Sequence, residues 1–141
     1  MTLVLRVAHV TLDSPEGYAA AIRAGRHRVG ADEPVARGGT DTAPSPYELL
    51  LAALASCTSI TLRMYAERKQ WTLGAIQVEA SYHLEGKEGR ITRVVSFGEA
   101  LGEEQRARLA EIAEKTPVTR ALKAGVPIAT TLRSADQTGE P

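Results

Sequence analysis

Hydrophobic and polar residues alternate along the first third of the chain, the pattern of β-strands with one apolar face. Residues 3–12 form the longest run, in which Leu3, Leu5 and Val7 are apolar at every second position. Two shorter runs follow at 18–24 and 26–32, separated from each other by Gly25. Because turn residues divide the runs, the pattern predicts a meander of three strands.

A long segment rich in Gly and Pro, residues 30–46, comes next. Structureless loops of this length are uncommon in compact domains. The segment is therefore expected to carry function or to cross to a partner.

A long helix is predicted from Pro46 to Lys69. Ser45, Pro46 and Glu48 fit a capping box, with Ser45 as N-cap, Pro46 at the first helical position and Glu48 at the third. A helix of these roughly 24 residues would be about 36 Å long. Its N-terminal half carries no charge on any side over LLLAALASC, whereas its last turns are charged.

A helix that is apolar all round must be covered all round. One sheet from so short a chain covers only one side of it. The other side needs a second protein surface, and a second copy of this helix is the simplest candidate. Small residues would let two helix backbones approach closely: Ala52, Ala53, Ala55, Ser56 and Ser59.

The C-terminal half mixes strands and helices. The pattern predicts a hairpin of strands 76–84 and 91–97, followed by an amphipathic helix over 103–115. A short helix over 117–124 is expected between Thr116 as N-cap and Gly125 as its end. A closing strand over 126–132 and a disordered tail over 134–141 follow. Residues 1–133 are expected to form a single domain.

The composition argues against nucleic-acid binding and membrane insertion. The chain has 141 residues and 15.1 kDa, 43% hydrophobic, with 17 basic residues balancing 17 acidic ones. A neutral chain with 4% aromatic residues gives no general reason to bind nucleic acid. No basic region precedes a long apolar run, and no stretch reaches the roughly 18 uncharged apolar residues of a membrane span. A soluble cytoplasmic protein without membrane association is expected.

Candidate chemistry centres on Cys57, the one cysteine, which excludes an internal disulfide and a Cys-rich zinc site. His9, His27 and His83 are far apart and have no metal-ligand spacing, so no metal site is expected. Nucleotide-binding glycine motifs are also missing from the sequence, and no cofactor is predicted.

Two interpretations of Cys57 remain open. It is either a small buried hydrophobe of the helix or a nucleophile, and a nucleophilic thiolate so far from the helix N-terminus needs a nearby cation. Arg26, His27 and Arg28 could supply that cation. Glu48 lies nine residues before Cys57, on the opposite side of a straight helix, so capping suits it better.

Three stretches resemble the OsmC/Ohr family of peroxide-stress proteins, which includes organic hydroperoxide reductases. They are GGTDTAPSPYELLLAALASCTSITLRMYAERK, KTPVTRAL and VPIATTL, within a similarity over residues 18–132. The resemblance implies an α+β fold made by two intertwined chains, with antiparallel sheets packed on two long central helices. It also implies an active site at the dimer interface.

The resemblance assigns the first of two family cysteines to Cys57, which would attack a peroxide O–O bond and become a sulfenic acid. The second family cysteine corresponds to Thr116, so this chain cannot complete a two-cysteine cycle. The family arginine would correspond to Arg26 or Arg28. The family glutamate sits one residue before Glu48, where this chain has Tyr47.

Three hypotheses follow. In the first, Cys57 reduces a hydroperoxide and an external thiol resolves the sulfenic acid, with Thr116, Glu48 and His27 as substrate contacts. In the second, the chain is not catalytic and binds a small apolar ligand at the dimer interface. In the third, Cys57 is only part of the core of a structural dimer.

Overall fold

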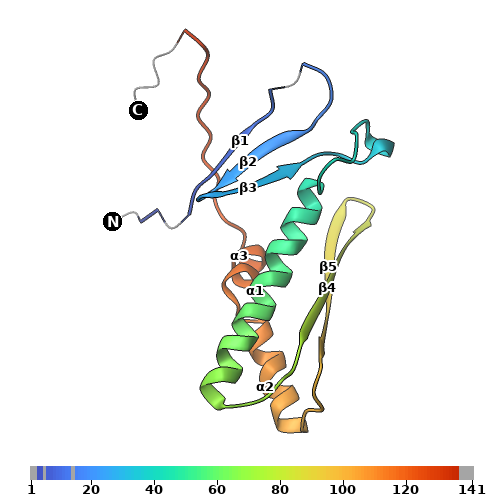
Figure 1. Ribbon diagram of the computed structural model, residues 1–141, viewed down its shortest axis with the longest axis vertical. Helices are drawn as coiled ribbons and strands as arrows, with labels where there is room; N and C mark the ends of the chain where they lie inside the picture. The colour runs from blue at the N-terminus through green and yellow to red at the C-terminus, as the bar shows by residue number, and fades with distance from the viewer. Residues whose placement is uncertain (1–2, 5, 14, 137–141) are drawn as a thin grey trace.

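The computed structural model describes residues 3–4, 6–13 and 15–136, and within them the chain forms two antiparallel sheets, one long helix and two shorter helices (Figure 1). The N-terminal sheet has the order β1-β2-β3, and β4 pairs with β5. The α+β class with antiparallel sheets is therefore confirmed. The elements are β1 (Ala8–Thr11), β2 (Ala20–Ala24), β3 (His27–Ala31), the 3-10 turn η1 (Val35–Arg37), α1 (Pro46–Lys69), β4 (Ile76–Glu85), β5 (Glu88–Phe97), α2 (Glu103–Ala113) and α3 (Pro117–Ala124).

Helix α1 begins and ends where the sequence predicts. The Glu48 N–H donates to Ser45 Oγ at 3.3 Å, and the Ser45 N–H donates to Glu48 Oε1 at 2.9 Å, which completes the capping box. Gln70 closes the helix in the left-handed conformation, with φ 59°. The two ends are thus fixed by local chemistry.

One side of α1 is packed against the rest of the chain. Its buried residues recur every four positions, so they form a single stripe that faces β4, α2 and α3: Leu54, Thr58, Leu62 and Ala66. Leu62 and Ala66 join Leu73 and Leu109 in the hydrophobic core cluster. The core therefore lies between α1, the β4–β5 hairpin and α2.

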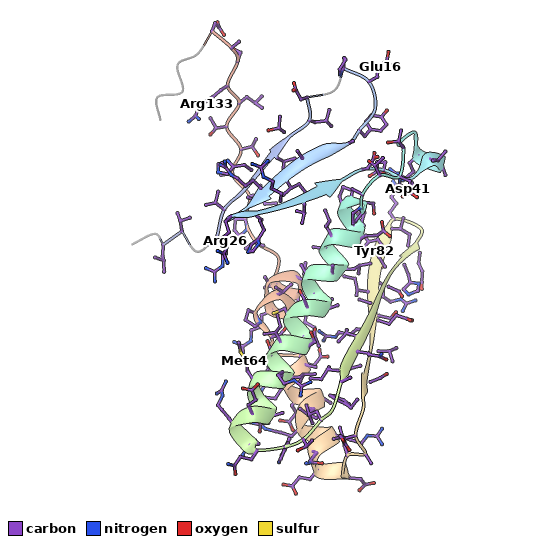
Figure 2. All side chains as sticks on the ribbon, viewed as in Figure 1. Glu16, Arg26, Asp41, Met64, Tyr82 and Arg133 are labelled. Carbon is purple, nitrogen blue, oxygen red and sulfur yellow. The ribbon has the colours of Figure 1, made fainter. Side chains whose placement is uncertain are left out.

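The opposite side of α1 is uncovered in the single chain. It carries Ala53, Ser56, Ile60 and Met64, all exposed, with Ile60 at 53% and Met64 at 54%. Met64 projects on the side of α1 away from β4 and β5 (Figure 2). The expectation that this chain covers the long helix on one side only agrees with the structure. We call these four residues the open face of α1.

The N-terminal sheet also has an uncovered apolar face. Val10, Ile22 and Val29 lie directly opposite one another in register, and so do Ala8, Ala24 and His27. Partners in register share a face. Val10 is 60% exposed and Val29 50% exposed. In Figure 1 this sheet extends beyond the N-terminal end of α1, whereas β4 and β5 run along the helix.

The predicted closing strand at 126–132 is wrong for the single chain. The segment has no regular secondary structure, and Ile128 and Leu132 are both 88% exposed. A strand requires a neighbour with which to exchange backbone hydrogen bonds, and within the described residues no strand pairs with this segment. The apolar alternation is present, but its pairing partner is not.

Other boundaries differ by a few residues. The first strand was expected over 3–12, but only Ala8 to Thr11 have partners on β2. The helix expected to end at Lys115 ends at Ala113, because the next residues turn into the cap of α3. Of the tail predicted to be disordered, 134–136 are exposed, and 137–141 lie outside the described residues.

The Gly- and Pro-rich loop is ordered by one buried carboxylate, that of Asp32, which is 2% exposed. Its Oδ2 accepts hydrogen bonds from the hydroxyls of Thr42 (2.7 Å) and Thr40 (2.8 Å) and from the Thr42 N–H (3.1 Å). Its Oδ1 accepts from the Glu33 N–H at 2.7 Å. The Asp32 N–H also donates to the Pro44 carbonyl at 3.0 Å, which closes the loop.

Gly39 is packed inside this loop. A Cβ at position 39 would lie 1.9 Å from the carbonyl oxygen of Glu33 and 2.8 Å from Oδ1 of Asp32. The backbone here therefore admits no side chain. The hydrogen bonds from the side chains of Thr42 and Thr40 hold the pKa of Asp32 well below its ordinary value of 3.8.

The Asp32→Asn substitution should destabilise the protein at pH 7, and by a smaller margin at pH 3. Because the folded state lowers the pKa of Asp32, the unfolded state binds more protons below about pH 4. The contribution of Asp32 is thus fully present above its ordinary pKa and is lost as the pH falls toward the lowered one. Urea titrations at pH 7 and at pH 3 would measure the difference in unfolding free energy between wild type and Asp32→Asn at each pH.

Asp41→Asn is the matched control, because Asp41 is exposed in the same loop, at φ 53°, a conformation that Asn tolerates. It should leave both free energies almost unchanged. A gap between wild type and Asp32→Asn of the same size at pH 3 as at pH 7 would contradict the role given to the carboxylate.

Candidate functional site

Cys57 lies at the border between the packed side and the open face of α1. Its side chain is half-buried, and Ala53, one turn earlier on the helix, is exposed. The sulfur lies 4.0 Å from Oγ1 of Thr61, one turn further on. Among the described residues the Cys57 thiol has no other hydrogen-bond partner. The thiol is therefore not sealed in the core, and no guanidinium group of the described residues is hydrogen-bonded to it.

The cations expected near Cys57 lie on the N-terminal sheet. Gly25 and Arg26 form the two-residue turn between β2 and β3, with Gly25 at φ 61°. His27 shares the apolar face with Ala24, whereas Arg28 pairs with Arg23 on the other face. Arg26, His27 and Arg28 are exposed, and within the described part of the chain none forms an ion pair or hydrogen bond through its side chain. The single chain does not bring them to the thiol.

Glu48 acts as a helix cap. The hydrogen bond from the Ser45 N–H, and after it the interaction with the Ser45 hydroxyl, hold the pKa of Glu48 below its ordinary value. The bond from the Ser45 N–H is also one of the two bonds of the capping box. The capping interpretation of Glu48 therefore agrees with the structure, and the carboxylate is engaged at the start of α1.

Thr116 is fully buried and begins α3. Its Oγ1 accepts a hydrogen bond from the Thr119 N–H at 3.3 Å and lies 2.6 Å from the Thr119 hydroxyl. The predicted role as N-cap is confirmed. With 0% exposure in the single chain, Thr116 has no surface with which to meet a substrate.

The sequence reasoning missed Arg93, which lies at the centre of the packed side. From β5 its Nη1 donates to the hydroxyls of Thr58 (2.8 Å) and Thr119 (2.9 Å). Its Nη2 donates to the Ala113 carbonyl at 3.1 Å and contacts Glu114 Oε2 at 3.2 Å. The side chain is 12% exposed. One guanidinium thus joins β5 to α1, α3 and the end of α2.

The strand pattern contained a signal for this position. Arg93 falls in phase with the half-buried Ile91, Val95 and Phe97, whereas Thr92 and Val94 between them are exposed. A charged residue at an inward position of a strand requires buried polar partners. The in-phase arginine could therefore have indicated a polar contact inside the fold.

A groove of about 690 Å³ lies between α1, the β4–β5 hairpin and α3. Its apolar lining includes Leu50, Leu54, Ile91 and Leu122. Its charged lining consists of Arg93, Lys123 and Glu114, and Glu114 pairs with both cations. Tyr47 and Tyr82 close one end, with ring centroids 4.6 Å apart.

The two tyrosines also interact through their hydroxyls. The hydrogen bond with Tyr47, followed by burial, raises the pKa of Tyr82. This end of the groove is therefore closed by two phenol side chains.

Two further features concern metal binding and the membrane. Within the described residues, no group of three or more His, Cys, Asp or Glu side chains is arranged to hold a metal ion. Helix α1 is long and apolar enough to cross a membrane, with a mean hydropathy of 1.5 over its most apolar window. This is weak evidence for a span, because the core helix of a soluble protein passes the same test.

Comparison with known proteins identifies the family. A family profile described as OsmC-like protein matches residues 39–131, from the Asp32 loop through α3. The chain belongs to the OsmC-like protein family. The match includes both Cys57 and Thr116, so the resemblance expected from the sequence is confirmed.

Solved structures share the fold of this OsmC-like chain. A protein from Psychrobacter arcticus, described as an osmotic stress induced and detoxification response protein, superposes with a TM-score of 0.72 at 18% identity, covering 85% of this chain and 90% of that one. An organic hydroperoxide resistance protein OsmC from Legionella pneumophila gives 0.65 at 18%, covering 87% and 92%. The organic hydroperoxide resistance protein OhrB of Bacillus subtilis gives 0.61 at 21%, covering 88% and 94%. The search of curated proteins found no match.

The Arg93→Met substitution should destabilise this OsmC-like chain by about 1–3 kcal/mol. Methionine keeps much of the apolar stem but leaves the buried hydroxyls and the Ala113 carbonyl short of a donor. Urea unfolding followed by circular dichroism would measure the loss. Arg90→Met, on the same strand but 54% exposed and paired with Glu85, should change stability by less than about 0.5 kcal/mol. Equal effects of the two substitutions would argue against the central role of Arg93.

Proposed function

We propose that the chain is a homodimeric, cytoplasmic hydroperoxide reductase of the oxidative stress response that uses Cys57 as its only redox thiol. One observation carries the proposal: the half-buried sulfur borders the open face of α1. A second chain placed on that face would enclose the thiol without burying it in the core of either copy. The active site would then lie at the interface between the copies.

Three unpaired features support an intertwined dimer. The open face of α1, the apolar face of the N-terminal sheet and the exposed segment 126–132 all carry apolar side chains that this chain does not cover. Exposed apolar surface of this kind marks an interaction site. A twofold dimer can cover all three, because each copy supplies what the other lacks.

The proposed chemistry balances without a metal or cofactor. The Cys57 thiolate attacks one oxygen of the peroxide, the O–O bond breaks, and the product alkoxide takes up a proton to become an alcohol. The sulfur is left as a sulfenic acid. A small external thiol condenses with it, releasing water and forming a mixed disulfide. A second thiol then reduces that disulfide and restores Cys57.

The single cysteine requires this external step. Thr116 stands at the position of the second family cysteine, and a hydroxyl cannot form a disulfide. Thr116 is a buried helix cap and Glu48 is an exposed one. Both residues therefore have a structural role, and neither is assigned a substrate contact. Arg26 is the cation assigned to activate the partner copy's thiol, and His27, on the apolar face of the sheet, is the assigned substrate contact.

The second candidate is a ligand-binding protein without catalysis. The groove beside α1 favours it, because four apolar side chains line a space that also contains two tyrosines and the ion-paired Arg93, Lys123 and Glu114. Such a lining suits a small amphipathic ligand. Ligand binding in this groove would be unaffected by Cys57→Ser, whereas reduction of peroxide would disappear.

The function can be tested by mixing the reduced protein with cumene hydroperoxide in the presence of dithiothreitol. Wild type should consume peroxide at least about tenfold faster than free cysteine, as expected for a positioned, activated thiol, and dimedone should trap a sulfenic acid on Cys57. Cys57→Ser should retain its thermal midpoint and lose both signals. Peroxide loss no faster than with free cysteine would reject the reductase and leave the ligand-binding candidate.

The dimer can be tested by sedimentation velocity. Wild type should run at about 30 kDa, twice the chain mass of 15.1 kDa, with a thermal midpoint that rises with protein concentration. Ile60→Glu, which places a charge on the open face of α1, should shift the protein toward monomer. Lys87→Glu, at the exposed β4–β5 turn, is the control and should remain dimeric. A wild-type monomer in dilute solution would contradict the assembly.

A further inference from the structure

Two arginine side chains and one histidine side chain stand in one row across the N-terminal sheet. In the strand register His9 lies opposite Arg23, and Arg23 lies opposite Arg28. Residues paired in this way point to the same face of a sheet, with Cβ atoms about 5 Å apart. All three are exposed. We call His9, Arg23 and Arg28 the cationic row.

The cationic row lies on the face opposite the apolar one. Val10, Ile22 and Val29, which alternate with it along the strands, point the other way. A partner that covers the apolar face of the sheet would therefore leave the row in contact with solvent. The row is a separate surface from the interface proposed for the dimer.

No acidic side chain of the described residues neutralises this row. Strands β1, β2 and β3 contain no Asp or Glu, and none of the three cations forms an ion pair or a side-chain hydrogen bond within the described part of the chain. Glu33, close to the end of β3, pairs with Arg37 at 2.9 Å. Glu16 lies at the opposite end of the sheet from Arg26 (Figure 2).

The arrangement is unfavourable for the sheet itself. Like charges directly opposite each other destabilise a strand pair. The chain as a whole is neutral, with 17 basic and 17 acidic residues, so the row is a local separation of charge and not a consequence of basic composition. An anion bound between Arg23 and Arg28 would turn this repulsion into attraction.

The surface beside the row carries only small side chains. The next residues in register on the same face are Thr11, Ala21 and Gly30, which have small side chains or none. Ala43 of the Asp32 loop borders them, since its Cβ lies 3.1 Å from where a Cβ on Gly30 would be. A ligand whose anionic group meets the row would have room for its remaining atoms over the exposed Thr11 and Ala21, with the Thr11 hydroxyl as a polar contact.

We propose that the cationic row binds the phosphoryl group of a small phosphorylated compound. Two neighbouring guanidinium groups offer paired N–H donors that match the oxygens of a phosphate dianion, and the imidazole of His9 adds a third donor. The role of Arg28 is thus anion binding. This site is independent of Cys57 and of peroxide reduction.

The test uses the full-length ¹⁵N-labelled protein and two probes, inorganic phosphate and glucose 6-phosphate. Both should shift the backbone amide signals of Arg23 and Arg28 and raise the thermal midpoint, whereas sodium chloride at the same ionic strength should not. Arg23→Gln and Arg28→Gln should each weaken binding about tenfold or more. Arg23→Lys keeps the charge but not the paired donors and should lie between wild type and Arg23→Gln. Arg90→Gln and Cys57→Ser should bind as wild type does.

The variants themselves report on folding. Without phosphate and at low salt, Arg23→Gln should melt at the same temperature as wild type or higher, because it removes a repulsion. Equal changes in the amide signals and the thermal midpoint with chloride, sulfate and phosphate would mean that the row only responds to general charge screening, and would overturn the proposal. Binding only to vesicles that contain phosphatidylglycerol, and not to the soluble probes, would assign the row to a membrane surface and would also overturn it.

Discussion

The guanidinium group of Arg93 reaches from β5 to the hydroxyls of Thr58 on α1 and Thr119 on α3 and to the Ala113 carbonyl at the end of α2. The apolar contacts of α1 are non-directional, so they hold the helix against its neighbours without fixing its rotation or height. The four polar contacts of Arg93 supply that direction. They also leave only one side of α1 turned inward, which is why Cys57 lies at the edge of the packed region.

The chain has the properties of one half of an assembly. Apolar residues remain exposed on α1, on the N-terminal sheet and along 126–132, although the core cluster around Leu62 and Leu73 is closed. A chain of 141 residues has too little material to surround a helix of 24 residues on all sides. The same shortage leaves the Cys57 thiol half-buried, outside the core cluster of its own chain.

Features fixed by local chemistry could be predicted from the sequence, and features fixed by distant partners could not. The ends of α1 follow from Ser45 and Glu48, so Pro46 and Lys69 are both correct. The strand expected at 126–132 depends on a pairing partner that alternation alone does not reveal. Thr116 was recognised as a cap, but the hydrogen bond that Arg93 donates to Thr119 joins residues 26 positions apart and needed the fold.

The Asp32 loop has a mechanical consequence for the N-terminal sheet. A backbone hydrogen bond links Asp32 to Pro44, so residues 32–44 form a closed loop and not a flexible linker. The three strands are therefore attached to the start of α1 by a short, stiff joint. Insertions should be tolerated only at the outer rim of the loop, around η1, where the side chains face water; anywhere nearer the carboxylate they would alter the angle at which the sheet leaves the helix.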